Sequence, residues 1–366
     1  MTLPGRFNTL GDYDVVVIGA GPAGCAAAIF CARHGLRVAL LEQCAFPRER
    51  PGETLPPGIE PLLQQLDVAD AVVQGDFIRH TGHWVQWGAG RRFSAFGGEP
   101  ATPWRGFQIP RATFDSLLLE KAVERGVHVV QPCRVNEVIR HNDRVIGART
   151  TAGEFFSRQL IDASGSHSWL MRQLALDHSL FSPLLIAKYG YATGERAACD
   201  EAPGIVADAQ GWYWTARVAP KLYNWTRLYF DKAQARQAGP PAMFDHLTAM
   251  GGVRGADVTW RSCHRTAGDG YFIVGDAAFV LDPGTSHGVL KAIMSGMMAA
   301  HAIIRENALP RHRSAINTQY RQWMQRWFVR DMNAMGELYR SHPSPPHWLS
   351  MTDRRNQATT EAAGHR

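Results

Sequence analysis

Apolar and polar positions are arranged in two different ways along this chain, and the difference predicts two kinds of sheet. Val15–Ile18 is an unbroken apolar run, as expected of a parallel strand that is covered on both faces. Residues 77–96 instead alternate aromatic and polar side chains between glycines, which predicts antiparallel strands. Residues 171–259 are rich in aromatic side chains, which indicates a mostly antiparallel sheet. The pattern therefore predicts an α/β (α+β) fold in which a Rossmann-like domain carries an inserted antiparallel domain.

Helices are predicted where apolar side chains recur at helical spacing, and a loop is predicted where prolines accumulate. Residues 46–57 contain four prolines, too many for a helix or a central strand. The predicted helices cover residues 22–34, 59–66, 111–126, a segment from about residue 288, and residues 318–339.

These elements predict discontinuous domains, because the parallel-sheet pattern returns after the antiparallel segments. The nucleotide-binding domain is expected to comprise residues 1–80, 104–170 and 260–310. The substrate domain, the C-terminal helical segment and a polar, poorly ordered tail are expected at residues 81–103 with 171–259, 311–350 and 351–366.

A phosphate-binding turn follows the first strand. Gly19, Gly21 and Gly24 give G-x-G-x-x-G, and an Ala-rich helix begins directly after the turn. The first glycine permits the tight turn, the second lets a pyrophosphate approach the backbone, and the third allows the helix to pack closely. Glu42 ends the next strand, where an acid holds a ribose hydroxyl. Strand, turn, helix, strand and acid in this order predict a dinucleotide site.

Two further strands run into turns of small residues. One ends at Asp162, Ala163, Ser164 and Gly165, and the other ends at residues 275–276. An open α/β sheet binds its ligands at the carboxyl ends of its strands. Three such turns in one chain favour a single extended nucleotide cofactor.

Composition narrows the class of protein. The 366 residues are 45% hydrophobic and 20% charged with a net charge of +6, which is typical of a globular protein. No apolar run is long enough to span a membrane, and the first residues lack the apolar core of a signal peptide, so we expect a cytoplasmic protein. The six cysteines form no C-x-x-C pair, so we expect no metal site, and scattered basic residues give little support to nucleic-acid binding.

Beyond these patterns, the chain resembles FAD-dependent monooxygenases of the hydroxybenzoate-hydroxylase fold, in the branch with flavin-dependent halogenases and geranylgeranyl reductases. The resemblance covers most of the chain and rests on G-A-G-P-A-G at 19–24, R-P-G-E-T at 50–54, D-A-S-G at 162–165 and G-D-A-A…D-P…S-H-G-V at 275–289. It implies tightly bound FAD, with Asp276 on the ribityl chain and residues 283–288 beside the flavin ring. The cofactor-binding residues that it implies are Gly19, Gly21, Ala23, Gly24, Glu42, Gln43, Arg50, Glu53, Thr54, Arg111, Arg134, Val135, Asp162, Ser164, Gly165, Gly275, Asp276, Pro283, Ser286, His287, Gly288 and Val289.

The same resemblance leaves two oxidative reactions to decide between. Halogenases carry G-W-x-W-x-I-P and a lysine that passes on hypohalous acid. Here residues 211–215 match the first part of that motif, but Ala216 and Arg217 replace its Ile-Pro end, and Arg79 occupies the lysine position. An arginine stays charged and substitutes poorly for a lysine. We therefore expect hydroxylation through a flavin hydroperoxide, with halogenation as the alternative.

Within this branch the chain is most similar to the flavoproteins that mature tryptophylquinone cofactors. That similarity implies a tryptophan of a partner polypeptide as substrate, with O2 and either NAD(P)H or a separate flavin reductase as the electron source. His287, beside the flavin loop, is the first candidate for a polar catalytic contact, followed by Glu53 and Arg79 and then by His83. Each is equally consistent with a structural role. A geranylgeranyl-reductase-like enzyme and a non-catalytic flavin-bound assembly partner remain open alternatives, and a monomer is plausible.

Overall fold

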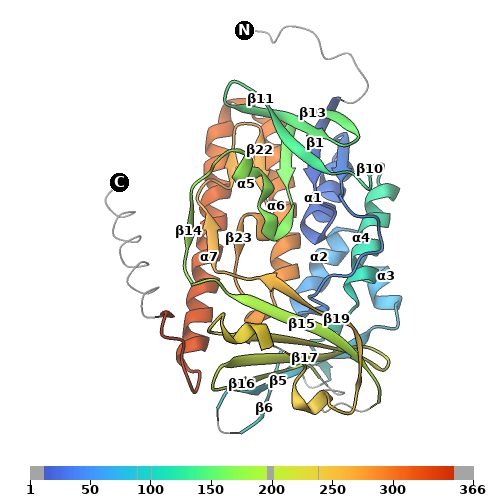
Figure 1. Cartoon of the computed structure of the whole chain (residues 1–366). Helices are drawn as coiled ribbons and strands as arrows, with labels where there is room; N and C mark the ends of the chain where they lie inside the picture. The colour runs from blue at the N-terminus through green and yellow to red at the C-terminus, as the bar shows by residue number, and fades with distance from the viewer. Residues whose placement is uncertain (1–11, 89, 100, 196–201, 238, 350–366) are drawn as a thin grey trace.

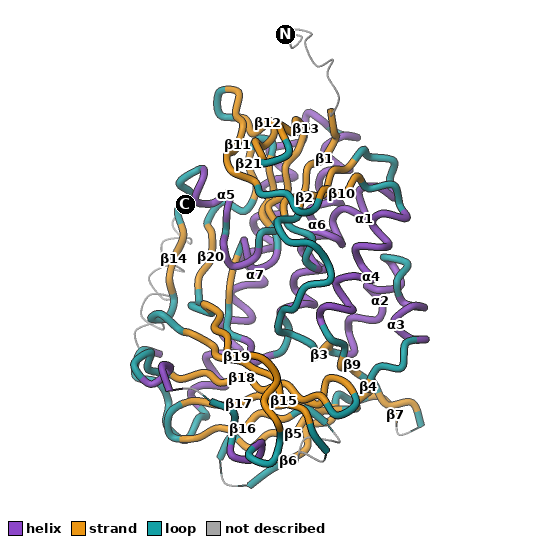
Figure 2. The backbone as a smooth tube through the Cα atoms, turned by 45° about the vertical axis from the view of Figure 1, so that its right-hand side comes forward, coloured by secondary structure: helices purple, strands orange, loops and turns teal. Residues whose placement is uncertain are grey.

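The computed structural model describes residues 12–88, 90–99, 101–195, 202–237 and 239–349 (Figure 1). The described chain forms two sheet-based parts, one mainly parallel and covered by helices, the other mainly antiparallel (Figures 1 and 2). The tail predicted to be poorly ordered, residues 351–366, and Cys199 lie outside the described residues. None of the helices described is long and apolar enough to cross a membrane.

The first part is built on an eight-stranded sheet with β1 at its centre. Val15, Val16 and Val17 of β1 are completely buried, as the apolar run predicts, because both faces of the strand are covered. The strand order is β10 (His128–Val130), β2 (Val38–Leu41), β1 (Asp12–Ile18), β13 (Gly153–Asp162), β12 (Arg144–Thr150) and β11 (Val135–His141), with β22 (Tyr271–Ile273) beside β13 and β21 (Ala267–Gly268) beside β22.

Three strands of this sheet end side by side. Ile18 of β1 pairs with Asp162 of β13, and Asp162 pairs with Ile273 of β22, all in parallel register. These strand ends are far apart in the sequence, but the sheet brings them to one edge. The three turns therefore lie at one edge of the sheet, as the prediction of a single ligand site requires.

Helices cover this sheet and connect it to the second part. Gly296 of α6 packs directly on α1, because a Cβ there would lie 2.2 Å from the carbonyl oxygen of Ala23. Helix α7 hydrogen-bonds the first part through Tyr320, whose hydroxyl donates to the Ile273 carbonyl (2.9 Å), and runs on to the second (Figure 1). The helices are α1 (Pro22–Arg33), α2 (Glu60–Gln65), α3 (Ala69–Gln74), α4 (Arg111–Glu124), α5 (Trp169–Gln173), α6 (Gly288–Ala308) and α7 (Arg313–Arg340).

The second part is a seven-stranded sheet drawn from residues 82–95 and 186–257, which lie within the segments predicted to form the substrate domain. Its neighbours are antiparallel except β16 and β5, which are parallel. The strand order is β19 (Thr248–Asp257), β15 (Ile186–Thr193), β18 (Leu222–Tyr229), β17 (Gly211–Ala219), β16 (Gly204–Asp208), β5 (Gly82–Gln86) and β6 (Arg92–Ala95).

Three small sheets accompany the two large ones, and they contain strand pairings that the sequence did not predict. Residues 54–55 of the proline-rich loop form a strand, since they pair with Gln108 and Phe107. Residues 178–180 lie outside the seven-stranded sheet because they pair with residues 261–263. These sheets are β3 (Thr54–Leu55), β9 (Gly106–Gln108) and β4 (Ile78–His80); β14 (His178–Leu180), β20 (Arg261–Cys263) and β23 (Phe279–Val280); and β7 (Gly98–Glu99) with β8 (Thr102–Pro103).

Candidate flavin and substrate site

The turn after β1 is shaped by contacts that exclude side chains. Gly19 has a φ of +99°, and a Cβ there would lie 2.4 Å from the Ala163 carbonyl oxygen. At Gly24 a Cβ would lie 1.8 Å from the carbonyl oxygen of Gly19. A Cβ at Gly21 would meet only the Arg48 guanidinium, at 3.6 Å. Two glycines are thus required by the fold, whereas Gly21 leaves open space at the N-terminus of α1, where a pyrophosphate would bind.

Glu42 lies beside this turn, as the spacing predicts. Its Oε2 accepts a hydrogen bond from the Ala20 amide (2.8 Å) and its Oε1 one from the Cys44 amide (3.0 Å). The neighbouring Gln43 is exposed. Residues 134 and 135 follow Cys133, whose amide bonds the Glu42 carbonyl (2.6 Å), so they lie at the same end of the site.

Arg50 in the next loop was predicted to bind the cofactor, but in the structure Arg48 lies at the turn. Its guanidinium lies 3.6 Å from Glu42 and 3.6 Å from Asp115, with the side chain 13% exposed. Its buried Nε has no hydrogen-bond partner among the described residues. Arg50 is exposed. A guanidinium with an unpaired Nε beside the open space at Gly21 fits the pyrophosphate of FAD. The four-proline loop gave no signal for choosing between the two arginines.

Arg111 fixes the position of the R-P-G-E-T loop, residues 50–54. Its guanidinium binds the buried Asp115 through Nε (2.8 Å) and Nη2 (3.0 Å) and donates to the Pro51 carbonyl (2.8 Å). A Cβ at Gly52 would lie 3.2 Å from Arg111 and 3.7 Å from Val289. The loop therefore passes between the start of α4 and the start of α6.

Glu53 joins this loop to the seven-stranded sheet. It is 5% exposed, accepts a hydrogen bond from the Gly52 amide (2.9 Å), and accepts one from the hydroxyl of Tyr191 on β15. Burial raises the pKa of Glu53, although Tyr191 and Arg111 oppose the shift. Thr54 points elsewhere, since its hydroxyl donates to Gln108 (3.0 Å).

The second strand end stabilises its own turn. Asp162 is completely buried and accepts hydrogen bonds from the amides of Ser164 (2.9 Å) and Leu170 (2.8 Å). Ser164 Oγ accepts the Trp169 amide (3.0 Å), and Gly165 supplies a φ of +68°. The side chains predicted to contact the cofactor here are thus occupied by the local turn that precedes α5.

The third strand end meets the first. Gly275 has a φ of +57°, and a Cβ there would lie 3.2 Å from the Cβ of Ala23. The Gly275 amide donates to Ser295 of α6 (2.8 Å). Asp276 is half-exposed and forms an ion pair with the buried Lys291 (2.8 Å). The first and last motifs are therefore in direct contact and form a continuous cradle.

The loop between β23 and α6 is anchored at Asp282. Its carboxylate accepts hydrogen bonds from the indole of Trp260 (2.6 Å), the amide of Gly284 (3.0 Å) and the hydroxyl of Tyr339. Burial raises the pKa of Asp282 to about 6. Trp212, the first tryptophan of the halogenase-like motif, donates to Tyr339 (2.9 Å), so it has a structural partner.

His287 ends this loop as the N-cap of α6. Its side chain is exposed, yet partial desolvation by the surrounding protein lowers its pKa; Asp331 opposes the shift and Arg330 adds to it. Burial, Arg92 and His287 itself lower the pKa of His83 on β5. The His83 ring lies 6.3 Å from the Trp214 ring. His83 thus lies beside an aromatic side chain and within electrostatic range of a second catalytic candidate, His287.

Arg79, another catalytic candidate, is held on the small β3–β9–β4 sheet. Its guanidinium binds Glu60 (2.6 Å) and stacks on Phe107, 3.8 Å from the ring centroid. Glu53 lies by Arg111.

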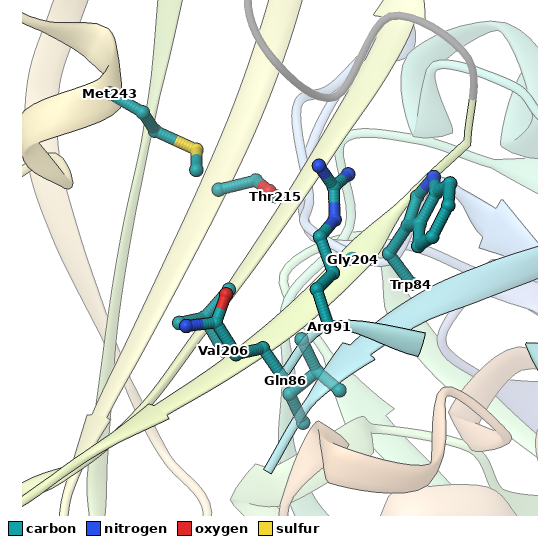
Figure 3. Close-up of a pocket in the computed structure, with 8 residues that line it drawn as sticks. Trp84, Gln86, Arg91, Gly204, Val206, Thr215 and Met243 are labelled. Atoms are coloured by element: carbon teal, nitrogen blue, oxygen red, sulfur yellow. The ribbon is translucent and has the colours of Figure 1, made fainter. Parts of the chain in front are cut away.

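A small pocket of about 50 Å³ lies on the seven-stranded sheet and is too small for an aromatic substrate (Figure 3). Its residues include Trp84, Arg91, Thr215 and Met243, and Arg91 lies over the Trp84 ring at 4.3 Å. The alternating aromatic side chains of residues 77–96 thus differ in burial. Trp87 is buried in the core, whereas Phe93 is 42% exposed.

Comparison with known proteins identifies the cofactor class. A family model described as an FAD binding domain matches residues 12–308. A 1H-pyrrole-2-carbonyl-[peptidyl-carrier protein] brominase of Pseudoalteromonas luteoviolacea is 30% identical over 319 residues, covering 80% of this chain and 77% of the brominase. A tryptophan 2-halogenase of Chondromyces crocatus is 28% identical over 319 residues, covering 79% of this chain but only 60% of that protein.

Solved structures share the fold. The myxobacterial chondrochloren halogenase CndH superposes with a TM-score of 0.84 at 24% identity, covering 97% of this chain and 90% of that one. A probable FAD-dependent monooxygenase, pqsL of Pseudomonas aeruginosa, superposes with a TM-score of 0.77 at 18% identity, covering 94% and 100%. The predicted mixed α/β FAD-binding fold is confirmed.

Proposed function

This chain belongs to the FAD-binding-domain family of flavoprotein oxidoreductases, which includes flavin-dependent halogenases, and we propose that it uses FAD and O2 to oxidise an electron-rich aromatic ring. The observation that carries the proposal is the position of His287. It ends the loop that follows the third ligand-facing strand, and it is near enough to His83 to lower the pKa of that imidazole. The His83 ring in turn lies 6.3 Å from the Trp214 ring. Neutral imidazoles and an indole at the ring end of the cradle suit an aromatic substrate.

The residues that would hold FAD form the two ends of the cradle. The open turn at Gly21, the Arg48 guanidinium and Glu42 would bind the pyrophosphate and ribose. Asp276 would accept a ribityl hydroxyl, and the start of α6 would place backbone N–H groups beside the ring, where they favour negative charge. Bound FAD supplies the activation of oxygen.

His287 is the residue that we assign to proton transfer. Its lowered pKa keeps the imidazole neutral near pH 7, so it can accept the proton that an indole or phenol loses as it is oxidised. His83, whose pKa is also lowered, would bind the substrate from the opposite side. The hydrogen bond from Tyr191 to Glu53 joins the R-P-G-E-T loop to the seven-stranded sheet.

Halogenation is the first specific reaction that we propose, and the comparisons favour it over the expected hydroxylation. The relatives at 28% and 30% identity are named as a tryptophan halogenase and a brominase. Others of comparable identity carry the name flavin-dependent halogenase. These names describe the relatives, and they support a halide-dependent reaction for this chain.

Hydroxylation is the second reaction, and one structural observation favours it. The position where the resemblance requires a lysine holds Arg79, which binds Glu60 at 2.6 Å and stacks on Phe107. A guanidinium engaged in this way is charged and has no lone pair with which to pass on an oxidised halide. With such a residue, the ring would take oxygen directly.

We propose further that the ring is presented by another polypeptide, as a tryptophan side chain or a carrier-bound aromatic acid. Two relatives are named for substrates carried by a peptidyl-carrier protein, which supports a tethered substrate. Maturation of a tryptophylquinone cofactor remains the specific form of this proposal that the sequence resemblance suggested. Reduced FAD from NAD(P)H or from a separate reductase would start the reaction.

One experiment separates these reactions. The FAD-loaded protein is reduced by NAD(P)H and a flavin reductase and is then given O2 and a tryptophan-containing peptide. One sample contains bromide and the other does not, and the mass of the product is measured by mass spectrometry. Halogenation predicts bromine in the product only when bromide is present. Hydroxylation predicts one added oxygen in both samples. Consumption of reduced flavin with reduction of a prenyl substrate, and no need for O2, would contradict the oxidative proposal.

A further inference from the structure

Lys291 is a buried cation beside the flavin cradle that none of the roles above uses. It lies one turn into α6, and its side chain is 6% exposed. Its Nζ lies 2.8 Å from Asp276 Oδ1, donates to the Phe279 carbonyl at 3.1 Å, and lies 4.5 Å from the centroid of the Phe279 ring. Every described contact of the ammonium therefore joins α6 to the segment that carries the third ligand-facing turn.

The position is an unfavourable one for a lysine unless the charge is needed there. A buried ammonium loses its hydration, and the N-terminal end of a helix dipole repels a positive charge. Packing alone would be served by an uncharged side chain of similar length. The carboxylate partner is not buried in the same way, because the Asp276 side chain is 46% exposed. Lys291 thus holds Oδ1 of Asp276, while the Asp276 side chain remains half-exposed.

Arg111 adds a second positive charge to the same region. It is the buried guanidinium that fixes the R-P-G-E-T loop, and Asp276 interacts with it electrostatically. Arg111, however, is neutralised locally by its bidentate contact with Asp115. Lys291 has no carboxylate partner among the described residues other than the accessible Asp276.

We propose that Lys291 is a positioning residue for the flavin, in two linked ways. It fixes the Asp276 carboxylate so that the free edge can accept a hydroxyl of the ribityl chain. Its positive charge is buried, whereas the charge of its partner Asp276 is half-exposed and more strongly screened by solvent. The ammonium therefore also favours the anionic reduced flavin over the neutral oxidised one, which raises the reduction potential of bound FAD. This inference rests on FAD binding and is independent of which aromatic product is formed.

The test uses three substitutions at one position. Lys291→Met removes the charge and the hydrogen bonds, Lys291→Gln keeps a donor without charge, and Lys291→Arg keeps the charge. We expect Lys291→Met to bind FAD about tenfold more weakly, because a charge-assisted contact to Asp276 is lost. We expect both neutral variants to have a more negative midpoint potential, and Lys291→Arg to recover most of the wild-type value.

The measurements are FAD titration of the apo-protein by flavin fluorescence and anaerobic dye-coupled reduction of the FAD-loaded protein. Lys121→Met is the matched control, because Lys121 is a helical lysine that pairs with Glu124 (2.6 Å) on α4. It should match the wild type in both assays. If Lys291→Met lowers only the melting temperature and leaves the midpoint potential unchanged, the lysine is merely structural and the proposal is wrong. A Lys291→Gln potential equal to that of Lys291→Arg would overturn it too, even if Lys291→Met fails to fold.

Discussion

The two ends of the flavin cradle are built in different ways. The end at β1 depends on the absence of side chains: Gly19 and Gly24 are in contact with backbone atoms, and Gly21 leaves space. The end at α6 depends on side chains from distant segments, including Asp282 with Trp260 and Tyr339. A backbone-built end tolerates almost no substitution, whereas a side-chain-built end can be changed one interaction at a time. This difference orders the predictions below.

The largest effect is expected at the backbone-built end, where two glycines of one motif should behave differently. Gly24→Ala would place a Cβ 1.8 Å from the Gly19 carbonyl oxygen, so β1 and α1 must separate. We expect a loss of about 3 kcal/mol or more in the free energy of unfolding. Gly21→Ala meets only the Arg48 side chain at 3.6 Å and has a φ of −74°, so its apo-protein should fold normally. It should lose FAD, because the methyl group occupies the pyrophosphate space.

Urea unfolding of both apo-proteins and FAD titration measure the two effects separately. Equal stability losses in the two variants would contradict the distinction between a glycine required by the fold and one required by the ligand. The two substitutions lie three residues apart in one motif, so each variant serves as the control for the expression and solubility of the other.

At the side-chain-built end, His287→Ala should leave FAD binding intact and reduce turnover by about 10²-fold, because only a proton acceptor is removed. His83→Ala is the comparison, since His83 interacts with His287 from β5. We expect it to raise the KM more than it lowers kcat. Steady-state oxidation of the peptide substrate gives both constants. Unchanged turnover in His287→Ala would remove His287 from the mechanism.

The sequence predicted the backbone-built end almost completely, because glycine spacing, strand periodicity and the acid at residue 42 are local signals. It also identified the three strand ends. It selected Arg50 instead of Arg48, because only the folded loop shows which arginine lies against Glu42 and Gly21. It assigned Asp162 and Ser164 to the cofactor, although these residues cap their own turn. Lys291, Tyr191 and Trp260 act through partners more than ten residues away, so no local pattern marks them.

A pH experiment tests the buried anchor of the flavin loop. The pKa of Asp282 is raised by burial from 3.8 to about 6, so the folded state disfavours the ionised carboxylate relative to the unfolded chain. The stabilisation is present below pH 3.8 and is lost as the pH rises through about 6. Two pKa units correspond to about 3 kcal/mol.

Asp282→Asn does not titrate, so it isolates this contribution. Its free energy of unfolding will be offset by the altered hydrogen bonds to Trp260 and Gly284, but that offset is independent of pH. From pH 4 to pH 7, urea unfolding should show the wild type losing about 2 to 2.5 kcal/mol relative to the variant, because part of the total is already lost at pH 4. A constant difference across this range would mean that the loop accommodates the charge by another route.

The smallest effect is expected where the two parts of the molecule meet. Tyr191→Phe removes the hydroxyl that donates to Glu53 and leaves the ring in place on β15. Since Glu53 keeps the Gly52 amide and the nearby Arg111 charge, the cost should be about 1 to 2 kcal/mol in unfolding free energy. The pKa of Glu53 should rise further, because a hydrogen bond that lowers it is gone. A stability loss as large as that of Gly24→Ala would show that this end, too, depends on a single indispensable contact, and the contrast between the two ends of the cradle would fail.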